Sequence, residues 1–235
     1  MVNPVYIGTE LDLFSNAKNW KRYYASQLGT YIQGDVLEVG AGIGETSTYL
    51  MEAGNAKNWT CLEPDPALSV SITEKAKRGR FPIHPEIITA TLGDFTADKT
   101  FDTIVYIDVI EHIEDDLKEL QRAKNHLRPG GHLIILVPAH NFLFSPFDEA
   151  IGHFRRYNKK RLVQVIPAGL TVVLLRYLDS FGMGLSLTNR LLLRSKHPNA
   201  RQIHFWDRFI VPLSRITDPL TGFGLGKTLI GVWKA

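Results

Sequence analysis

The sequence lacks the features of a secreted or membrane-spanning protein. Cys61 is the one cysteine among 235 residues, so no disulfide can form within the chain and a reducing compartment is favoured. No basic segment followed by an apolar run stands at the N-terminus, and no stretch of about 18 uncharged apolar residues occurs. We therefore expect neither a signal peptide nor a membrane span, and we predict a cytoplasmic protein.

The sequence also lacks a strong excess of charge. It contains 27 Lys and Arg against 24 Asp and Glu, a net charge of +3, which is too small to indicate a nucleic-acid partner. Its composition, 44% hydrophobic and 22% charged, is that of a globular protein large enough for one domain with an insertion. We therefore predict no binding of nucleic acid.

The sequence does contain a regular alternation of strand-like and helix-like segments. Apolar runs of strand length are followed by segments whose apolar residues recur at helical spacing. This alternation predicts an α/β fold with a doubly wound, mostly parallel sheet of the Rossmann type. The predicted strands are 35–39, 59–63, 86–92, 101–107, 132–137, 170–178 and 225–233, and the predicted helices between them are 46–53, 66–78, 115–127 and 159–166.

A glycine-rich turn follows the first predicted strand. Gly40, Gly42 and Gly44 stand at every second position, where they let the backbone turn sharply and a ligand lie against it. A dinucleotide site would have its third glycine one residue later, at the position of Glu45, and the lysine of a triphosphate-binding loop is missing. The pattern therefore favours a cofactor that has an adenosine but no phosphates.

Acidic residues at three strand ends suit such a cofactor. Glu38 could hold a ligand ammonium, and Glu63, about twenty residues beyond the glycines, could accept hydrogen bonds from ribose hydroxyls. Asp94 could receive the adenine amino group while Phe95 packs on the ring. Asp65 stands beside Glu63 and is either a further cofactor contact or the N-cap of the next helix.

In these segments, over residues 34–138, the chain resembles the class I S-adenosylmethionine-dependent methyltransferases. The matching residues are Val36–Gly44, Glu63, Gly93–Phe95, Phe101–Val105, Asp108–Ile113 and Leu127–Gly131. The resemblance implies a seven-stranded sheet with an antiparallel last strand, and S-adenosyl-L-methionine as the cofactor with S-adenosyl-L-homocysteine as its product. The residues it implies at the cofactor are Glu38, Gly40, Ala41, Gly42, Gly44, Glu63, Pro64, Asp65, Gly93, Asp94 and Phe95, with Asp108 and His112 near the methyl donor.

A long segment without clear periodicity, 139–157, follows the fifth predicted strand and suggests an active-site loop. Its motifs, Ser145–Asp148 and Gly152–Tyr157, resemble those of bacterial small-molecule or sugar-pathway methyltransferases. Removal of an acceptor proton needs a base, so His112, His140 and His153 are the candidate catalytic residues. Arg155 and Arg156 could clamp an anionic substrate, or pair with Asp148 and Glu149 to order the loop. The candidate substrate contacts are Tyr24, His140, His153, Arg155, Arg156 and Tyr157, although Tyr157 is better suited to packing.

Two further parts flank the predicted methyltransferase domain, which comprises 34–178 and 225–235. Residues 1–33 form either a helical lid over the ligand or a helix packed on the sheet edge. Residues 179–224 form a helical insertion before the last strand, which we predict to be a substrate cap. The alternatives to a substrate cap are a subunit interface and a contact with an anionic membrane that carries a lipid-linked acceptor. Its interleaved basic residues are Arg190, Arg194, Lys196, Arg201, Arg208 and Arg215.

The sequence thus predicts an enzyme that transfers a methyl group to a small-molecule acceptor, and it favours oxygen over nitrogen as the acceptor atom. Alternatives are N-methylation of a small amine, a nicotinamide-dependent oxidoreductase and a non-catalytic S-adenosylmethionine-binding protein. The segment Ile107–Ile110 lacks the Asn/Asp-Pro-Pro-aromatic motif of nucleobase amine methylation. No carboxylate and amide cluster for a metal-dependent catechol methylation can be assembled, so no metal site is predicted.

Overall fold

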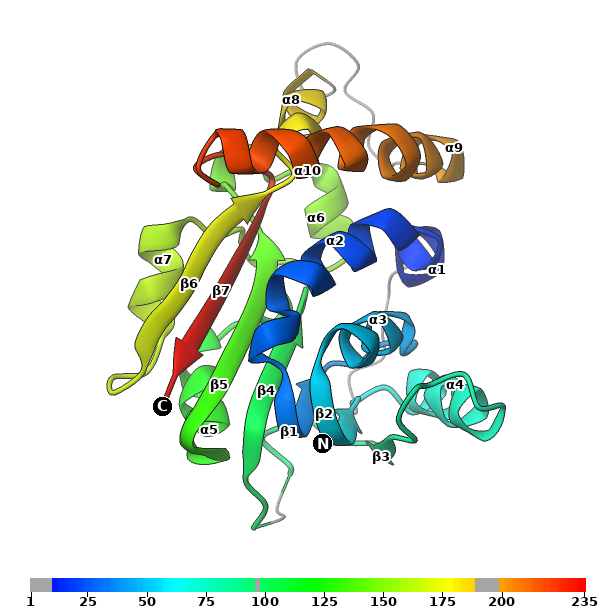
Figure 1. The fold of residues 1–235 in the computed structure, drawn as a ribbon, viewed down its shortest axis with the longest axis vertical. Helices are drawn as coiled ribbons and strands as arrows, with labels where there is room; N and C mark the ends of the chain where they lie inside the picture. Colours follow the sequence, from blue (N-terminus) through cyan, green and yellow to red (C-terminus); the bar gives the residue numbers. More distant parts are fainter. Residues whose placement is uncertain (1–9, 96–97, 189–198) are drawn as a thin grey trace.

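The computed structural model describes residues 10–95, 98–188 and 199–235. Its centre is one seven-stranded sheet in the order β3-β2-β1-β4-β5-β7-β6 (Figure 1). The pairs among β1 to β5 are parallel, whereas β7 is antiparallel to both β5 and β6, which confirms the expected sheet. The strands are β1 Gln33–Val39, β2 Asn55–Leu62, β3 Glu86–Ile88, β4 Phe101–Ile107, β5 Leu127–Pro138, β6 Thr171–Leu178 and β7 Thr228–Lys234.

Helices cover both faces of the sheet, and alternate residues of the strands pack against them. In β1, Val36 belongs to the hydrophobic core on the side of α2 and α3, and Leu37 to the core on the side of α5 and α7. A central strand buried on both faces explains the unbroken apolar run in its sequence. The helices are α1 Glu10–Ser15, α2 Lys18–Leu28, η1 Gly29–Tyr31, α3 Glu45–Ala53, α4 Pro66–Lys77, η2 Ile110–His112, α5 Asp116–Asn125, η3 Asn141–Leu143, α6 Pro146–Ala150, α7 Lys159–Val165, α8 Ser180–Thr188, α9 Ala200–Phe205, η5 Trp206–Ile210 and α10 Val211–Leu220.

Some predicted boundaries differ from the structure. The third strand stops at Ile88 instead of residue 92, and the fifth begins at Leu127 instead of residue 132. The segment 139–157 is not a plain loop, because it contains η3 and α6. Helix α6 begins with a reciprocal cap between Ser145 and Asp148, but its five residues are too few to produce a recognisable helical period.

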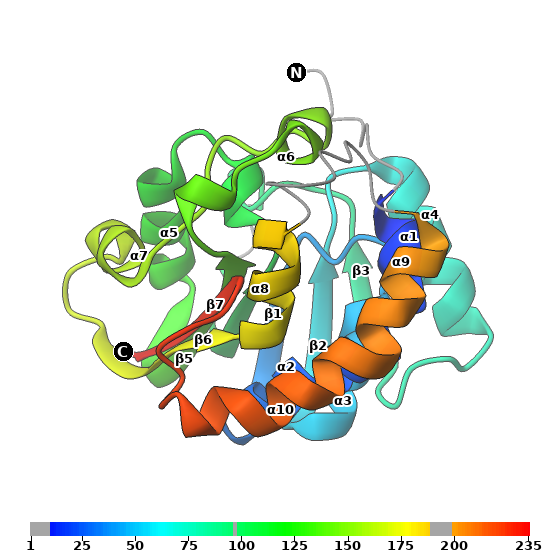
Figure 2. The ribbon, with the colours of Figure 1, turned by 90° about the horizontal axis from the view of Figure 1, so that it is seen from above.

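The part of the insertion that the structure describes is helical. Helix α9, the π-helical turn η5 and α10 follow one another without a break, and Figure 2 shows this run passing along one side of the sheet with α8 over the strand ends. Helix α2 packs against α3 on one side and against η5 and α10 on the other. Arg190, Arg194 and Lys196 of the predicted basic set lie outside the described residues. In the described parts of the chain, no helix combines the length and the apolar character that crossing a membrane requires.

The order of the strands determines where a ligand can bind. The chain continues from β1 to β2 and β3 on one side, and β4 returns to the other side of β1. In an open α/β sheet, the loops that leave the two neighbouring strands at such a reversal run in opposite directions. They leave a crevice at the carboxyl ends of these strands. The glycine turn after β1 and the segment after β4, which starts at Asp108, both lie at this place.

Candidate functional site

A cavity of about 1710 Å³ opens at the carboxyl ends of the strands. Its walls include the glycine turn, η2 and α6, together with parts of α1 and α2 from one end of the chain and of α8, α9 and η5 from the insertion. Pockets for one small molecule are typically about 300–1,000 Å³, so this cavity has room for two ligands at once.

The backbone conformation of the turn, together with a close side chain at Gly40, favours glycine there. Gly40 and Gly42 have φ angles of 71° and 59°, in the left-handed region that other residues rarely adopt. A Cβ atom on Gly40 would also lie 2.7 Å from Cγ2 of Val109. The Gly40 amide donates to the Leu62 carbonyl at 2.8 Å, which joins the turn to the end of β2.

Glu63, the predicted ribose acid, lies on the cavity wall and also holds the glycine turn. Its Oε2 atom accepts a hydrogen bond from the Gly42 amide at 2.7 Å, and its Oε1 atom accepts one from the Asp65 amide at 2.9 Å. Burial raises the pKa of Glu63. Asp65 is the N-cap of α4, because its Oδ1 atom accepts from the amides of Ala67 and Leu68. It also lines the cavity, so the two roles proposed for it are compatible.

Glu38 reaches the cavity from the end of β1. Its Oε2 atom accepts a hydrogen bond from the indole nitrogen of Trp59 at 2.9 Å. Burial raises the pKa of Glu38 to about 7, so its carboxyl group gains a negative charge only near neutral pH in the absence of a ligand. A ligand ammonium next to this group would favour the charged form.

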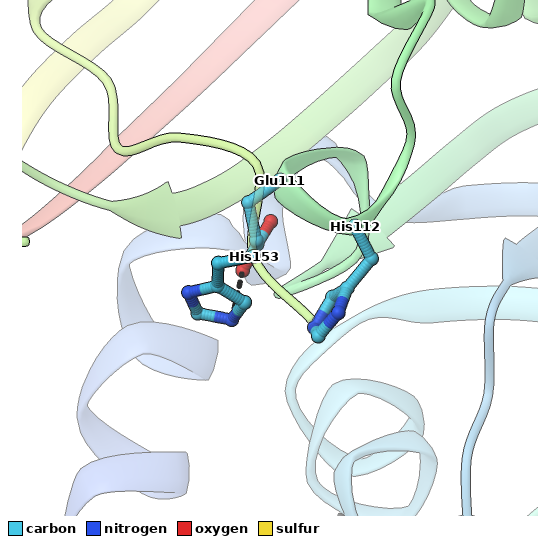
Figure 3. Close-up of side chains that lie close together, drawn as sticks. All are labelled: Glu111, His112 and His153. Atoms are coloured by element: carbon cyan, nitrogen blue, oxygen red, sulfur yellow. Dashed lines mark ion pairs between the residues drawn. The ribbon is translucent and has the colours of Figure 1, made fainter. Parts of the chain in front are cut away.

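Three side chains, Glu111, His112 and His153, meet at the cavity wall (Figure 3). One ligand-type atom from each lies within 4.8 Å of those of the other two. The imidazole rings of His112 and His153 are in edge-to-face contact, with centroids 4.5 Å apart. No metal site is predicted from the sequence, but the fold brings this set together because η2 follows β4 directly and His153 follows α6.

Each member of the cluster has an unusual environment. Glu111 is fully buried, and burial together with the nearby charge of Asp108 raises its pKa well above the usual value. Neither of its carboxylate oxygens has a hydrogen-bond partner among the described residues, and His153 Nε2 is 3.9 Å from its Oε1 atom. Burial, with the neighbouring His153, lowers the pKa of His112 to about 4, so this imidazole is neutral at physiological pH.

Asp148 and Arg156 hold His153 of the cluster in place through hydrogen bonds. Asp148 Oδ1 lies 2.9 Å from Nδ1 of His153. Arg156 donates to both carboxylate oxygens of Asp148, at 2.8 and 2.9 Å, and Ser145 donates to Oδ2. These contacts lower the pKa of Asp148, in opposition to the effect of its burial. Arg156 therefore orders this segment by pairing with Asp148, which is one of the two roles predicted for it.

Asp108 lines the cavity between the end of β4 and the start of η2. It follows β4 with a φ angle of 53°, and its side chain is exposed to the cavity although protein surrounds it on the other sides. This burial raises the pKa of Asp108 to about 7, against the charges of Arg156, Lys227 and Lys21. A non-glycine residue held in this backbone conformation is a common feature of functional sites.

Most of the predicted site residues line the cavity. Tyr24 does so from α2, where its hydroxyl pairs with that of Thr46. The predicted residues that the cavity brings together are Tyr24, Glu38, Gly40, Ala41, Gly42, Glu63, Pro64, Asp65, Gly93, Asp108, His112, His153 and Arg156.

Three predicted cofactor residues do not line the cavity. Gly44 is the N-cap of α3, and its amide donates to the Ala41 carbonyl at 2.9 Å within the turn. Asp94 accepts a hydrogen bond from the Thr91 hydroxyl at 2.6 Å, and its neighbour Phe95 packs against Phe101 and His126. The short third strand leaves Thr91, Leu92 and Gly93, rather than these two side chains, at the wall.

Three predicted acceptor residues also lie away from the cavity wall. His140 stacks between Phe142 and Tyr177. Arg155 pairs with Asp116 at 3.1 Å, instead of with the predicted partners. Tyr157 is fully buried and donates to Asp116 at 2.8 Å, which agrees with the prediction of a packing role.

Glu111 and Asp148 are not among the site residues predicted from the sequence. Glu111 stands next to His112 directly after a strand, and this adjacency is the signal that could have identified it. The role of Asp148 depends on contacts with His153 and Arg156 that only the folded segment brings together. Trp206, in the insertion, also lines the cavity, and no local pattern indicates this.

A model of the methyltransferase domain family matches residues 17–206 of the chain. Demethylmenaquinone methyltransferase of Tropheryma whipplei is 29% identical over 172 residues, which cover 71% of this chain and 67% of that protein. Ubiquinone biosynthesis O-methyltransferase of Rickettsia conorii is 28% identical over 101 residues, which cover 43% of this chain and 34% of that protein.

Solved structures share the fold. The N-methyltransferase NodS of Bradyrhizobium japonicum, in complex with S-adenosyl-L-homocysteine, superposes with a TM-score of 0.57 at 14% identity. The superposition covers 97% of this chain and 91% of that one. At this identity the likeness establishes the architecture alone.

Proposed function

The chain belongs to the methyltransferase domain family and is an S-adenosylmethionine-dependent methyltransferase, and we propose that it methylates an oxygen atom of a small molecule. In such a reaction the oxygen lone pair attacks the methyl carbon in line with the breaking S–C bond. The electron pair of that bond stays on sulfur, and S-adenosyl-L-homocysteine remains. The enzyme contributes mainly by holding the two reactants in line and excluding water.

The glycine turn and its acids are the proposed cofactor site. Gly40, Gly42 and Glu63 form one hydrogen-bonded wall at the switch point of the sheet, with Glu38 beside it. The cofactor's amino-acid end would lie toward Glu38 and its ribose toward Glu63. This leaves the part of the cavity next to Asp108 for the methyl group and the acceptor.

The cluster of Glu111, His112 and His153 supports the choice of a hydroxyl acceptor, and an ammonium acceptor, which must also lose a proton, is the alternative. A hydroxyl acceptor has to release a proton, so a group that polarises its O–H bond must contact the acceptor oxygen. The cluster offers two imidazoles and a buried carboxyl group on the same cavity wall as the glycine turn. The relative from Rickettsia conorii is named an O-methyltransferase, which supports the same choice.

Transfer of a labelled methyl group tests this proposal. We would incubate the protein with S-adenosyl-L-methionine carrying a ¹³C methyl group and with panels of phenols, quinols and small amines. The expected product is a methyl ether; label found only on nitrogen or only on carbon would refute oxygen as the acceptor. Calorimetry should show binding of S-adenosyl-L-homocysteine, whereas binding of NAD without it would favour an oxidoreductase.

A matched pair of histidine variants tests the cluster. His153→Ala should lower the rate of transfer about 100-fold, because the acceptor oxygen loses a contact that matters in the transition state. His140→Ala should leave the rate near that of the native protein, because His140 does not line the cavity. Equal rates for His153→Ala and the native protein would remove the cluster from the mechanism.

We further propose that the acceptor is apolar enough to reside in a membrane, and that the protein collects it at an anionic lipid surface. The continuous helix 200–220 has an outward-facing apolar stripe whose members are each at least 42% exposed. One of them, Phe205, also lines the cavity, so the stripe reaches its mouth. Exposed arginines beside the stripe suit anionic headgroups. The stripe is Phe205, Phe209, Leu213, Ile216 and Leu220, and the arginines are Arg201, Arg208 and Arg215.

Co-sedimentation with vesicles tests this surface. The protein should sediment with phosphatidylglycerol vesicles more than with phosphatidylcholine vesicles, and the double variant Phe209→Ser, Ile216→Ser should lose most of this binding. The double variant Val70→Ser, Leu117→Ser removes equally exposed apolar residues elsewhere and serves as the control. Equal loss in both variants, or no sedimentation of the native protein, would exclude a lipid-binding stripe.

A further inference from the structure

We propose that Glu111, His112 and His153 bind a divalent transition-metal ion such as Zn²⁺, and that an open position on this ion holds the acceptor oxygen. The first half stands on the geometry of the cluster alone. The second half rests on the proposed function, because it assumes an oxygen acceptor in the same cavity.

The donor atoms are close to the arrangement that a metal ion requires. One atom from each of the three side chains lies within 4.8 Å of the other two. Ligands of a tetrahedral zinc ion, each about 2.0–2.2 Å from the metal, are about 3.3–3.6 Å from one another. The donors therefore have to approach one another by at most about 1.5 Å, a distance that side-chain rotation can cover.

His153 is held as metal-binding histidines usually are. The hydrogen bond between its Nδ1 atom and Asp148 fixes the proton on Nδ1, which leaves the lone pair of Nε2 facing Glu111 at 3.9 Å. Arg156 and Ser145 in turn hold the Asp148 carboxylate. A carboxylate that orients the outer nitrogen of a metal-bound imidazole is the common second layer of such sites.

Glu111 is difficult to explain without a ligand. Its two carboxylate oxygens are fully buried and lack hydrogen-bond partners among the described residues. A buried polar group without a partner costs free energy, and each such group calls for an explanation. A cation shared with the two imidazoles would supply the missing partner.

The donor set indicates the class of ion and its role. Two imidazoles and one carboxylate suit zinc and similar transition metals better than Mg²⁺ or Ca²⁺, which prefer oxygen ligands alone. Three protein ligands are typical of catalytic zinc sites, in which the fourth position takes water or substrate. An acceptor hydroxyl in that position would become more acidic and could release its proton to water in the cavity.

Titration of the metal-free protein with zinc chloride tests the site without any assay of activity. After chelation and removal of the chelator, calorimetry should show one equivalent of zinc bound. Glu111→Gln and His153→Gln should each weaken this binding at least tenfold, and Asp148→Asn about 10- to 100-fold through the orientation of His153. His84→Gln changes an exposed histidine outside the cavity and should bind zinc as the native protein does.

Calorimetry with S-adenosyl-L-homocysteine on the same proteins separates the two proposals. A variant that binds S-adenosyl-L-homocysteine as the native protein does is folded, because the proposed cofactor site lies on the glycine turn and none of these substitutions changes that turn. A native protein that binds S-adenosyl-L-homocysteine but no zinc, or variants that bind zinc as tightly as the native protein, would overturn the metal site and leave the proposed function intact. If the native protein binds one equivalent of zinc and the variants do not, the metal site is supported. If, in addition, no acceptor yields a methyl ether, the proposed function is overturned while the metal site stands.

Discussion

At the scale of single residues, Glu63 combines support of the backbone with a place on the cavity wall. Both of its carboxylate oxygens accept backbone hydrogen bonds, one from Gly42 within the glycine turn and one from Asp65 at the start of α4. Because it fixes two of the segments that surround the proposed cofactor site, its loss should affect binding in two ways, through loss of the proposed ribose contact and through a displaced turn.

Glu63→Gln should therefore weaken the binding of S-adenosyl-L-homocysteine at least tenfold. The amide group of glutamine would place N–H hydrogens against the N–H of either Gly42 or Asp65, and a hydrogen bond to a charged group contributes about 1.5–3 kcal/mol. Isothermal calorimetry measures the effect. Glu74→Gln, on the exposed side of α4, is the control. An affinity unchanged by Glu63→Gln would exclude both roles.

Glu38 should make the stability of the protein depend on pH. Its pKa is raised to about 7 in the folded chain, from 4.5 in the unfolded one. Between these values the folded state binds a proton that the unfolded state lacks, so the free energy of unfolding falls as pH rises from about 4.5 to 7 and levels off above that range. The contribution is on the order of 3 kcal/mol.

Urea unfolding at pH 5 and pH 8 measures this contribution. Glu38→Gln keeps an oxygen for the indole of Trp59 but cannot ionise, so its stability should fall less than that of the native protein over this interval. Glu52→Gln, at an exposed position of α3, should behave as the native protein does. If the free energy of unfolding falls by the same amount between pH 5 and pH 8 in all three proteins, Glu38 has an ordinary pKa.

The positions of the residues expected at the cofactor were easier to predict from sequence than the positions of those expected at the acceptor. Gly40, Gly42 and Glu63 follow strands directly, so their places along the chain determine their places at the sheet edge. The partners of Arg155 and His140 depend instead on how the segment 139–157 folds over η2 and β6. Asp116 and Tyr177, which hold these two side chains, are distant in sequence and give no local signal.

At the scale of elements, α2 depends on a residue from the other end of the chain. Its N-cap, Ala17, has no side chain that can cap the helix. Asp207, in the π-helical turn η5, instead accepts hydrogen bonds from the amides of Asn19 and Trp20, at 3.2 and 2.9 Å. The start of the predicted lid is thus capped by the insertion.

Asp207→Ala should lower the free energy of unfolding by about 1–2 kcal/mol, the usual cost of losing a helix cap. Urea denaturation measures the change, and hydrogen exchange of the first amides of α2 should increase. Asp12→Ala, which removes an exposed carboxylate from α1, should change stability by less than about 0.5 kcal/mol. A similar loss in both variants would assign the effect to charge rather than to the cap.

The long elements were predictable because their patterns are local. The apolar runs of β1, β4 and β5 are buried on both faces, and α5 has a clear polar and apolar face bounded by caps. Helix α6 and the turn η5 were not predictable in this way. One is too short for a period, and the π-helical turn shifts the period in the middle of a continuous helix.

At the scale of the whole molecule, the cavity joins segments from both ends of the chain. Leu11, Trp20 and Tyr24 form part of its wall from α1 and α2, while Ile203 and Trp206 contribute from α9 and η5. A ligand in the cavity contacts elements that belong to different predicted parts, so binding should stabilise the lid and the insertion together.

Hydrogen exchange with and without S-adenosyl-L-homocysteine tests this coupling. Slower exchange is expected in the glycine turn and also in α2 and η5, because Asp207 connects these two helices. Helix α7 packs in the core on the other face of the sheet and should exchange at the same rate in both states. Protection confined to residues 38–45 would show that the lid and the insertion respond independently.

The position of β7 has a consequence for biosynthesis. Translation produces β6, which ends at Leu178, well before β7, which begins at Thr228, yet β7 is the strand through which β6 joins the sheet. Until β7 emerges from the ribosome, β5 and β6 both present open edges, and Val172 and Val173 add exposed apolar surface. Open edges of this kind attract other chains. Chaperone binding during translation should therefore be concentrated on the nascent chain between the synthesis of β6 and that of β7.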